Sequence, residues 1–283
     1  MNTKILNNIL EKENRKPILF DLFFNKNSGK KPVVIFCHGY KGFKDWGAWS
    51  LVAESFSKKK FFFLKFNFSH NGGTVDNPID FPDLDSFGNN NFSLELEDLD
   101  RVIEWILTNK DYSDQIDRDD ISLIGHSRGG GIVLIKASED KKIKRVITWA
   151  GVRDFKERFN IGSPEFELWK KNGVTYIENA RTKQMMPHYF QFFKDFLKNE
   201  SKFKIESAVG KLRIPYLVVH GDKDTSVLPK NGESLFSWNK NNEIFRVDGG
   251  DHVFSSKHPW NSNSLPIELD LVVKKTIEFI ERN

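Results

Sequence analysis

The chain has 283 residues, of which 39% are hydrophobic and 29% are charged. These proportions are typical of a globular protein and exclude a collagen-like or largely disordered chain. The formal net charge of +4 is small for this length and the basic residues are interspersed with acidic ones, so nucleic acid is not an indicated partner. We expect one domain spanning residues 1–283.

The N-terminal residues contain an apolar stretch that Asn7 and Asn8 interrupt and that charged residues follow. This pattern matches neither a secretory signal peptide nor a membrane span. Cys37 is the single cysteine and lies in an apolar run, so we expect a buried thiol and no internal disulfide. Together these features favour a reducing compartment and predict a cytoplasmic protein.

Short apolar runs alternate along the chain with longer amphipathic segments. The predicted strands are residues 18–24, 33–37, 61–68, 121–125, 146–150, 216–220 and 243–247. Residues 33–37 and 216–219 are continuously apolar, as expected of central strands that are buried on both faces. This alternation predicts an α/β fold with a mainly parallel sheet and helices on both faces.

Two of the intervening segments show helical periodicity. The first has apolar residues at helical spacing, namely Leu99, Val102, Ile103, Ile106 and Leu107. Its charged residues fall on the opposite side, namely Glu97, Asp98, Arg101 and Glu104, which predicts a surface helix. A final helix is predicted around Val273, Ile277 and Ile280, with Pro266 near its start.

Residues 152–209 interrupt the alternation, because they are rich in aromatic residues and methionine and lack a clear central strand. We interpret this segment as a small helical cap inserted in the domain. A helix opening after Pro187 is expected to place the following residues on one face: Tyr189, Phe190, Phe193, Phe196 and Leu197. These side chains either belong to an ordinary packed core or line an acyl or aryl pocket.

Residues 125–129, Gly-His-Ser-Arg-Gly, carry the strongest chemical signal in the chain. An apolar strand-like run leads into them, and a small, apolar, helix-compatible run follows. A Gly-x-Ser-x-Gly sequence in this context forms a sharp strand-to-helix turn that exposes the serine hydroxyl above a helix N-terminus. Ser127 is therefore a candidate nucleophile, and the alternative is a glycine-rich turn with a capping serine.

A serine hydroxyl needs a base to take its proton and a third group to orient that base. His-Gly-Asp-Lys-Asp at residues 220–224 follows one predicted central strand, and Gly-Gly-Asp-His at 249–252 follows the next strand. The order serine, acid, histidine is the order that this architecture uses. Asp222 and Asp224 are both candidates for the acid, and His252 is the candidate base.

Four motifs at matching places make the chain resemble the α/β-hydrolase superfamily: His38-Gly39-Tyr40 after a strand, the Gly-x-Ser-x-Gly turn, His-Gly-x-x-Asp ending at Asp224, and Gly-x-x-His ending at His252. The resemblance covers nearly the whole chain. Within the superfamily, the chain is similar to small esterases of the cinnamoyl or feruloyl esterase and dienelactone-hydrolase-like branch. That closer similarity rests on the length of the insertion and on residues 212–222.

The resemblance implies Ser127 as nucleophile, His252 as general base and then acid, and Asp224 as the carboxylate that orients the imidazole. Asp224 is implied rather than Asp222 because the acid of the family usually stands three residues after the glycine of His-Gly. The same resemblance implies that the backbone N–H groups of Tyr40 and Arg128 form the oxyanion hole.

The remaining candidates have plainer interpretations. We expect Asp251 to have a loop role, because adjacent side chains rarely reach one another in the geometry that His252 requires. His126 and His220 are expected to be structural, whereas His70, His188 and His258 have no partner that the sequence identifies. The histidines and carboxylates lack metal-ligand spacing and no dinucleotide-binding glycine motif is present, so no metal and no cofactor are expected.

These features predict a serine hydrolase that cleaves carboxylic esters through an acyl-enzyme, with an apolar or aromatic acyl group suggested by the aromatic cap. The expected partner is a small-molecule ester, and the sequence leaves the oligomeric state open. Two alternatives remain: a peptidase or acyltransferase with the same triad, and a noncatalytic ligand-binding member of the fold.

Overall fold

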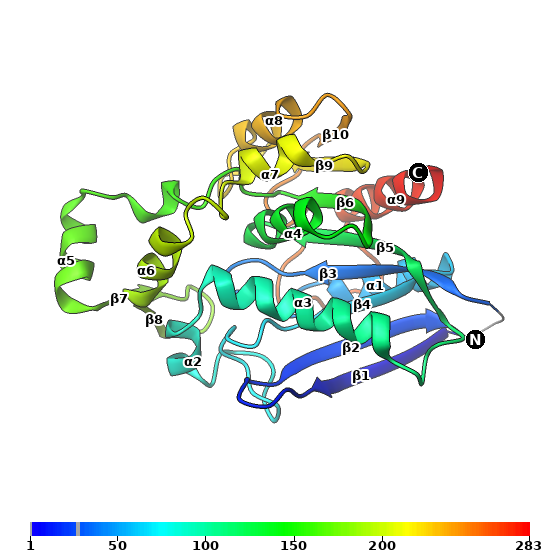
Figure 1. Ribbon diagram of the computed structural model, residues 1–283, viewed down its shortest axis with the longest axis horizontal. Coiled ribbons are helices and arrows are strands. Elements are labelled where there is room, and N and C mark those ends of the chain that lie inside the picture. The colour runs from blue at the N-terminus through cyan, green and yellow to red at the C-terminus, as the bar shows by residue number, and fades with distance from the viewer. Residues whose placement is uncertain (1, 27–28) are drawn as a thin grey trace.

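The centre of the molecule is a twisted sheet, seen in the computed structural model of Figure 1, which describes residues 2–26 and 29–283. The strand order is β1-β2-β4-β3-β5-β6-β9-β10. The strands are β1 (Asn2–Leu10), β2 (Ile18–Asn25), β3 (Lys31–Cys37), β4 (Phe62–Phe66), β5 (Ile116–His126), β6 (Ile143–Trp149), β9 (Tyr216–Gly221) and β10 (Asn242–Val247). The pairs β1–β2 and β2–β4 are antiparallel, and every other neighbouring pair in this sheet is parallel.

All the strands predicted from the sequence are present, and the fold is the α/β-hydrolase fold that the sequence predicted. The sequence analysis missed β1, whose residues are partly exposed and polar as often as apolar. Pairing with β2 holds this edge strand in place, with a break in register between Ile5 and Asn8. Asn7 lies within that break, has a positive φ of 54° and donates its N–H to Asp21.

Helices cover both faces of the sheet, as Figure 1 shows. On one face lie α3 (Phe92–Thr108), α4 (Arg128–Glu139), α7 (Ile205–Lys211) and α8 (Lys230–Ser237), and on the other lie α1 (Trp49–Lys58) and α9 (Ile267–Arg282). Alternate residues of the strands supply the two cores, so that Val33 and Ile35 face the first layer whereas Val34 and Phe36 face the second. Pro266 precedes α9, as expected.

The prediction for α3 was wrong in one respect, since Asp98 and Arg101 are buried rather than on a solvent face. The two side chains form an ion pair of 3.1 Å with each other. Asp98 also accepts the N–H of Ser69, and Arg101 donates to the carbonyl oxygens of Leu10 and Lys16. These partners come from distant parts of the chain, so helical periodicity alone cannot reveal them.

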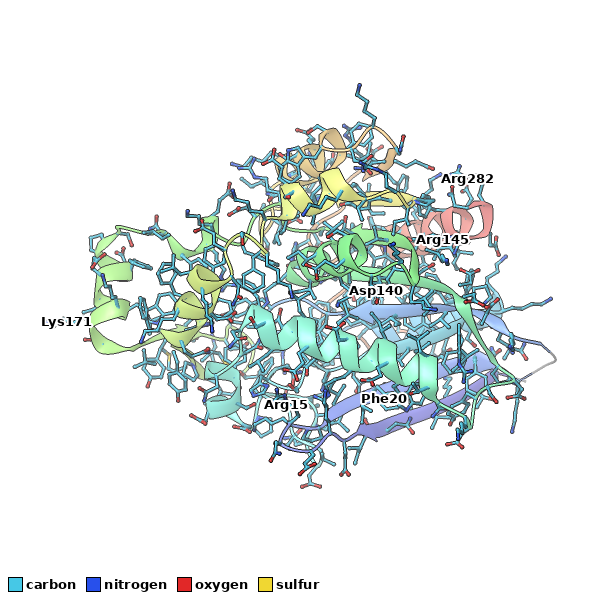
Figure 2. The ribbon with its side chains drawn as sticks, in the orientation of Figure 1. Arg15, Phe20, Asp140, Arg145, Lys171 and Arg282 are labelled. Atoms are coloured by element: carbon cyan, nitrogen blue, oxygen red, sulfur yellow. The ribbon has the colours of Figure 1, made fainter. Side chains whose placement is uncertain are left out.

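The cap segment, residues 152–209, leaves the sheet after β6 and projects to one side of it (Figure 1). It contains a short 3-10 helix (Glu157–Phe159), α5 (Pro164–Asn172), a hairpin of β7 (Val174–Glu178) and β8 (Met185–Tyr189), and α6 (Gln191–Lys198), and it ends within α7. The short helix α2 (Leu84–Gly88) packs against β8. In Figure 2, Lys171 of α5 lies at one end of the molecule and Arg282 of α9 lies toward the other.

The helix predicted after Pro187 differs from the structure. Residues 185–189 form a strand, and the helix begins at Gln191. Phe193 and Phe196 are buried in an aromatic cluster, whereas the Leu197 side chain is 58% exposed. Most of these aromatic residues therefore pack against one another, as the core alternative required. In the described residues, no helix is long and apolar enough to cross a membrane.

Candidate active site

Ser127 lies at the sharp turn between β5 and α4. Its backbone is strained, with φ of 56° and ψ of −120°. Glycines make the turn possible, because a Cβ on Gly125 would lie 2.3 Å from the carbonyl oxygen of Gly129, and a Cβ on Gly129 would lie 2.6 Å from that of His38. The turn is pinned by the Ser127 N–H, which donates to Trp149 on β6 at 2.9 Å. The strain is thus held by the surrounding structure, as is common at functional sites.

His252 and Asp224 come together at the carboxyl ends of the last two strands. The Nδ1 atom of His252 is 2.8 Å from Oδ2 of Asp224. The other oxygen, Oδ1, accepts the N–H groups of Ser226 and Val227, each at 2.8 Å. Burial alone would raise the pKa of Asp224, but the contacts with His220 and His252 hold it well below its usual range. The carboxylate is therefore fixed in position and ionised.

A cavity of about 600 Å³ connects Ser127 with this pair, since Ser127 and His252 both lie in its wall. Ser127 is 8% exposed and the His252 side chain is 20% exposed, so both reach the cavity. The hydroxyl of Ser127 and the imidazole of His252 form no hydrogen bond with each other within the described part of the chain. Nucleophile–base hydrogen bonds are often looser in enzymes without substrate and tighten when it binds.

The loop after β3 carries Tyr40 past the nucleophile. A Cβ on Gly39 would lie 2.8 Å from Cβ of Ser127, so only glycine allows this approach. His38 shapes the loop from inside, because its Nδ1 bonds to the Gly39 carbonyl at 2.8 Å and its Nε2 accepts the Phe68 N–H at 3.2 Å. Burial, with a smaller contribution from the nearby Arg128, lowers the pKa of His38 to about 4, so the ring stays neutral.

The two backbone N–H groups predicted to form an oxyanion hole belong to residues next to Ser127 or to the loop that packs against it. The N–H of Arg128 is the first of helix α4, where N–H groups have no partner within the helix. The N–H of Tyr40 lies in the loop next to it. Within residues 2–26 and 29–283, neither N–H donates a hydrogen bond, so both are available to an oxyanion.

Buried charges anchor the far side of the same loop. Lys44 and Lys65 are both fully buried, and each forms an ion pair with Asp21 and with Asp45. The Lys44 N–H also donates to the Asn67 side chain at 2.6 Å. This network ties β2, β4 and the loop together. The sequence analysis did not find it, since lysines are rarely buried and the partners are far apart in sequence.

The other predicted residues have structural partners. His126 bonds through Nε2 to the His252 carbonyl at 2.9 Å, and His220 bonds through Nε2 to the Val227 carbonyl at 2.7 Å. Asp222 accepts the Gly249 N–H at 2.7 Å and so braces the turn rather than touching His252. Asp251 accepts two backbone N–H groups of its own loop.

The structure shows a hydrogen-bond partner for each of the three histidines for which the sequence identified none. His188 of β8 bonds through Nε2 to the Tyr40 hydroxyl at 2.6 Å, His258 accepts the Gly47 N–H at 2.9 Å, and His70 contacts the Ser69 hydroxyl at 2.8 Å. No local sequence pattern predicts these contacts, because each depends on tertiary packing. Cys37 is buried, and burial raises the pKa of its thiol well above the usual value, as expected of a core thiol.

The side chain of Arg128 also has a role that the sequence did not suggest. It forms a 2.6 Å ion pair with Glu95 of α3, and the Glu95 side chain is 1% exposed. Burial raises the pKa of Glu95, while Arg128 and a hydrogen bond from Asn90 oppose that rise. The guanidinium of Arg128 lies 5.1 Å from the ring centre of Tyr40, so the two residues that were predicted to form an oxyanion hole also contact through their side chains.

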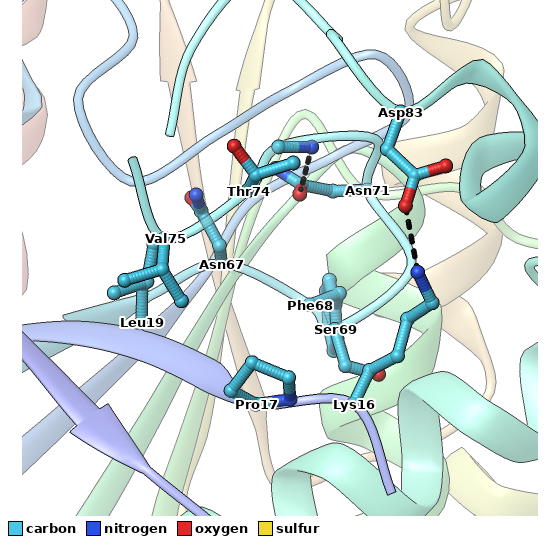
Figure 3. Close-up of a pocket in the computed structure, with 11 residues that line it drawn as sticks. Lys16, Pro17, Leu19, Asn67, Phe68, Ser69, Asn71, Thr74, Val75 and Asp83 are labelled. Carbon is cyan, nitrogen blue, oxygen red and sulfur yellow. Dashed lines mark hydrogen bonds and ion pairs between the residues drawn. The ribbon is translucent and has the colours of Figure 1, made fainter. Parts of the chain in front are cut away.

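A smaller cavity of about 230 Å³ lies beside the loop that follows β4 (Figure 3). An ion pair between Lys16 and Asp83 lies at its edge, and Asn67 and Thr74 point toward it (Figure 3). None of the predicted catalytic residues lines it. In the part of the chain that the structure describes, no group of three or more His, Cys, Asp or Glu residues is arranged to hold a metal ion.

The sequence model of one protein family, BD-FAE, matches residues 20–238. Among solved structures, Est1E from Butyrivibrio proteoclasticus is similar over 98% of both chains, with 18% identity and a TM-score of 0.72. A structure of Est1E with ferulic acid bound is similar over 97% of this chain and 98% of that one, with 19% identity and a TM-score of 0.70.

A dienelactone hydrolase from Anabaena variabilis is similar over 99% of this chain and 98% of that one, with 15% identity and a TM-score of 0.64. These likenesses establish the fold. No curated protein sequence matches the chain.

Proposed function

The chain belongs to the BD-FAE family, and from that premise we propose that it is a serine hydrolase that cleaves carboxylic esters through an acyl-enzyme intermediate. One observation carries the proposal. Ser127 stands at a strained turn in the wall of the same cavity as His252, and the Nδ1 of His252 is held 2.8 Å from a buried carboxylate. This is the arrangement by which a histidine activates a serine hydroxyl.

In the first half of the reaction, Nε2 of His252 takes the proton of the Ser127 hydroxyl as the oxygen attacks the ester carbonyl carbon. The carbonyl oxygen becomes an oxyanion, which accepts hydrogen bonds from the N–H groups of Tyr40 and Arg128. Asp224 accepts the Nδ1–H of the imidazole, which keeps Nε2 free to act as the base and stabilises the imidazolium that forms.

In the second half, the imidazolium of His252 gives its proton to the departing alcohol, and an ester between Ser127 and the acyl group remains. Water then enters, His252 takes a proton from it, and the hydroxide adds to the acyl carbon. Collapse of this second oxyanion releases the acid and returns the proton to Ser127. No metal or cofactor is needed in this scheme, because the oxyanion is stabilised by backbone donors.

Aromatic residues support an apolar or aromatic acyl group as the substrate. Trp46, Trp49 and Phe81 line the catalytic cavity, so an apolar substituent would find apolar surface there. Equal turnover of short aliphatic and aryl esters would count against this part of the proposal. The cap segment as an inserted unit at residues 152–209 and the cytoplasmic location stay predictions.

The proposal is tested by hydrolysis of chromogenic esters, from acetate to octanoate and a cinnamate-type ester. Ser127→Ala should lower kcat by at least about 10³-fold, because no other group can form the acyl-enzyme. Ser138→Ala is the matched control, since that hydroxyl bonds to a carbonyl at the far end of the same helix. Activity that survives in Ser127→Ala would refute the proposal, and turnover of amides or acyl transfer to alcohols alone would favour a peptidase or acyltransferase.

A further inference from the structure

A second cavity, of about 350 Å³, lies within the cap segment. Most of its wall is apolar, and includes Phe166, Trp169 and Phe192. Six polar residues also lie in this wall, namely Arg158, Asn160, Ser163, Glu165, Thr175 and His188. A mainly apolar cavity with a few polar groups is the usual form of a small-molecule site.

Tyr40 connects this cap cavity to the catalytic cavity. It lines the catalytic cavity, while its hydroxyl bonds to His188 of the cap cavity at 2.6 Å. The guanidinium carbon of Arg158 lies 4.9 Å from the ring centre of Tyr40 and 5.2 Å from that of Phe192. The cap cavity therefore begins one side chain away from the proposed oxyanion hole.

Of the two arginines that pack against Tyr40, one is paired with a carboxylate and the other is not. Arg128 is paired with Glu95, but among the described residues no carboxylate lies within ion-pair distance of Arg158. Burial, together with repulsion from Arg158 and Arg128, lowers the pKa of His188 to about 3, so His188 is neutral and leaves the arginine charge in place. The other charged group of the cavity wall, Glu165, lies at the N-terminus of α5.

Arg158 is an exposed residue that opens onto the cap cavity, and its guanidinium packs against the rings of Tyr40 and Phe192. Although the residue as a whole is exposed, its guanidinium packs between two rings, and this desolvation, together with repulsion from Arg128, lowers the pKa of Arg158 to about 10. The group still carries its positive charge at neutral pH. A guanidinium without a carboxylate partner in a largely apolar wall is a strong donor for a planar anion such as a carboxylate.

The position of His252 indicates which part of an ester would reach this cavity. His252 must give its proton to the leaving alcohol, and it lines the catalytic cavity but not the cap cavity. The alcohol therefore leaves on the His252 side. An acyl group that extends on the other side, past Tyr40, would then reach the cap cavity.

The following inference rests on the proposed hydrolase function. We propose that the preferred substrate is an ester whose acyl group carries a carboxylate at its far end, and that Arg158 binds this carboxylate. The apolar wall would hold the body of the acyl group. Arg158 is a specificity-determining residue in this scheme, because it touches the substrate remote from the reacting carbonyl.

The test compares pairs of esters that differ only by a carboxylate in place of a terminal methyl group. One pair is mono-para-nitrophenyl terephthalate and para-nitrophenyl para-toluate, and a longer, flexible pair is mono-para-nitrophenyl suberate and para-nitrophenyl octanoate. The readout is the ratio of kcat/KM for the two esters of a pair within one variant, so that any general loss of folding or activity cancels.

We expect wild type to favour the carboxylate ester of at least one pair by about tenfold or more, the size of a charge-assisted hydrogen bond. Arg158→Met should lower that ratio at least tenfold, and Arg158→Lys should restore part of it. Lys156→Met is the matched control, because it also removes one positive charge and lies only two residues from Arg158. Lys156 forms an exposed ion pair with Glu200, and its replacement should keep the wild-type ratio.

A wild-type ratio of one or less in both pairs would overturn the inference, and so would an unchanged ratio in Arg158→Met. The proposed hydrolase function is judged separately, by whether Ser127→Ala abolishes turnover of the neutral esters. Titration of Ser127→Ala with monomethyl terephthalate and methyl para-toluate gives the same comparison from binding alone. The inference is supported if Ser127→Ala binds monomethyl terephthalate more tightly than methyl para-toluate and if adding Arg158→Met removes this difference. Equal binding of the two esters to Ser127→Ala contradicts it.

Discussion

Replacing Asp224 by asparagine should disable the enzyme while leaving its shape intact. The introduced amide can still accept the N–H groups of Ser226 and Val227, because its oxygen can occupy the place of Oδ1, where both bonds are 2.8 Å long. Its NH₂ group then faces Nδ1 of His252, where a carboxylate oxygen now accepts at 2.8 Å. The imidazole must turn its lone pair toward that NH₂, which places the remaining proton on Nε2.

A protonated Nε2 cannot accept the proton of Ser127. We therefore expect kcat to fall on the order of 10⁴-fold, as the wrong imidazole tautomer produces in a Ser-His-Asp triad. This corresponds to about 5.4 kcal/mol of lost transition-state stabilisation. KM should change little, because the ground-state contacts of the substrate do not involve Asp224.

The assay is steady-state hydrolysis of a para-nitrophenyl ester, with thermal unfolding as a check of folding. Asp222→Asn is the matched control: it changes the same residue type two positions away, where the carboxylate braces the Gly249 turn, and kcat should stay within about threefold of wild type. The reasoning is refuted if folded Asp224→Asn keeps more than a tenth of wild-type kcat, or if Asp222→Asn loses as much.

Three further predictions concern Gly39 in the loop after β3, Gly210 on the surface of helix α7 and the buried histidine His126. Gly39→Ala should lower kcat at least tenfold in the same ester assay, because the added Cβ would lie 2.8 Å from Cβ of Ser127. Gly210→Ala in α7, where a Cβ meets nothing within 4 Å, should leave activity unchanged and raise the unfolding midpoint slightly. Burial lowers the pKa of His126 to about 3, so below about pH 6.5 the unfolded chain binds more protons and the free energy of unfolding falls as pH drops. His126→Gln should flatten that dependence in denaturant titrations between pH 4 and 6.5, by up to about 1.4 kcal/mol per pH unit.

Local sequence was enough to predict every strand of the central sheet except β1, and to propose which residues gather at its carboxyl edge. Strands such as residues 33–37 are apolar without interruption, and glycines mark the places where backbone passes close to Ser127. The resemblance to the α/β hydrolases implied Asp224 rather than Asp222 as the acid, because of its position after His220-Gly221. The structure then supplies what spacing cannot: the contact of Asp224 with His252 and the brace that Asp222 provides.

Features that depend on distant partners could not be predicted. β1 is held by pairing with β2 rather than by its own composition. The β7–β8 hairpin has strands of only five residues, and the side chains of β7 are partly or fully exposed, so this segment resembles a loop in sequence. Asp98 was expected on the solvent face of its helix, yet it is buried beside Arg101 of the same helix and accepts the N–H of the distant Ser69. Lys65 is buried in an ion pair with Asp21 of the neighbouring strand β2. The contact of Arg158 with Tyr40 likewise joins residues more than a hundred positions apart.

The acyl-enzyme at Ser127 is the central claim, and stoichiometric labelling with a fluorophosphonate tests it most directly. Intact-mass analysis and peptide mapping of the folded protein should show one phosphonyl group per chain, attached to Ser127, with ester hydrolysis lost in proportion to labelling. Ser127→Ala should remain unlabelled. An unlabelled wild-type protein, or hydrolysis that persists after Ser127 is fully modified, would contradict the account.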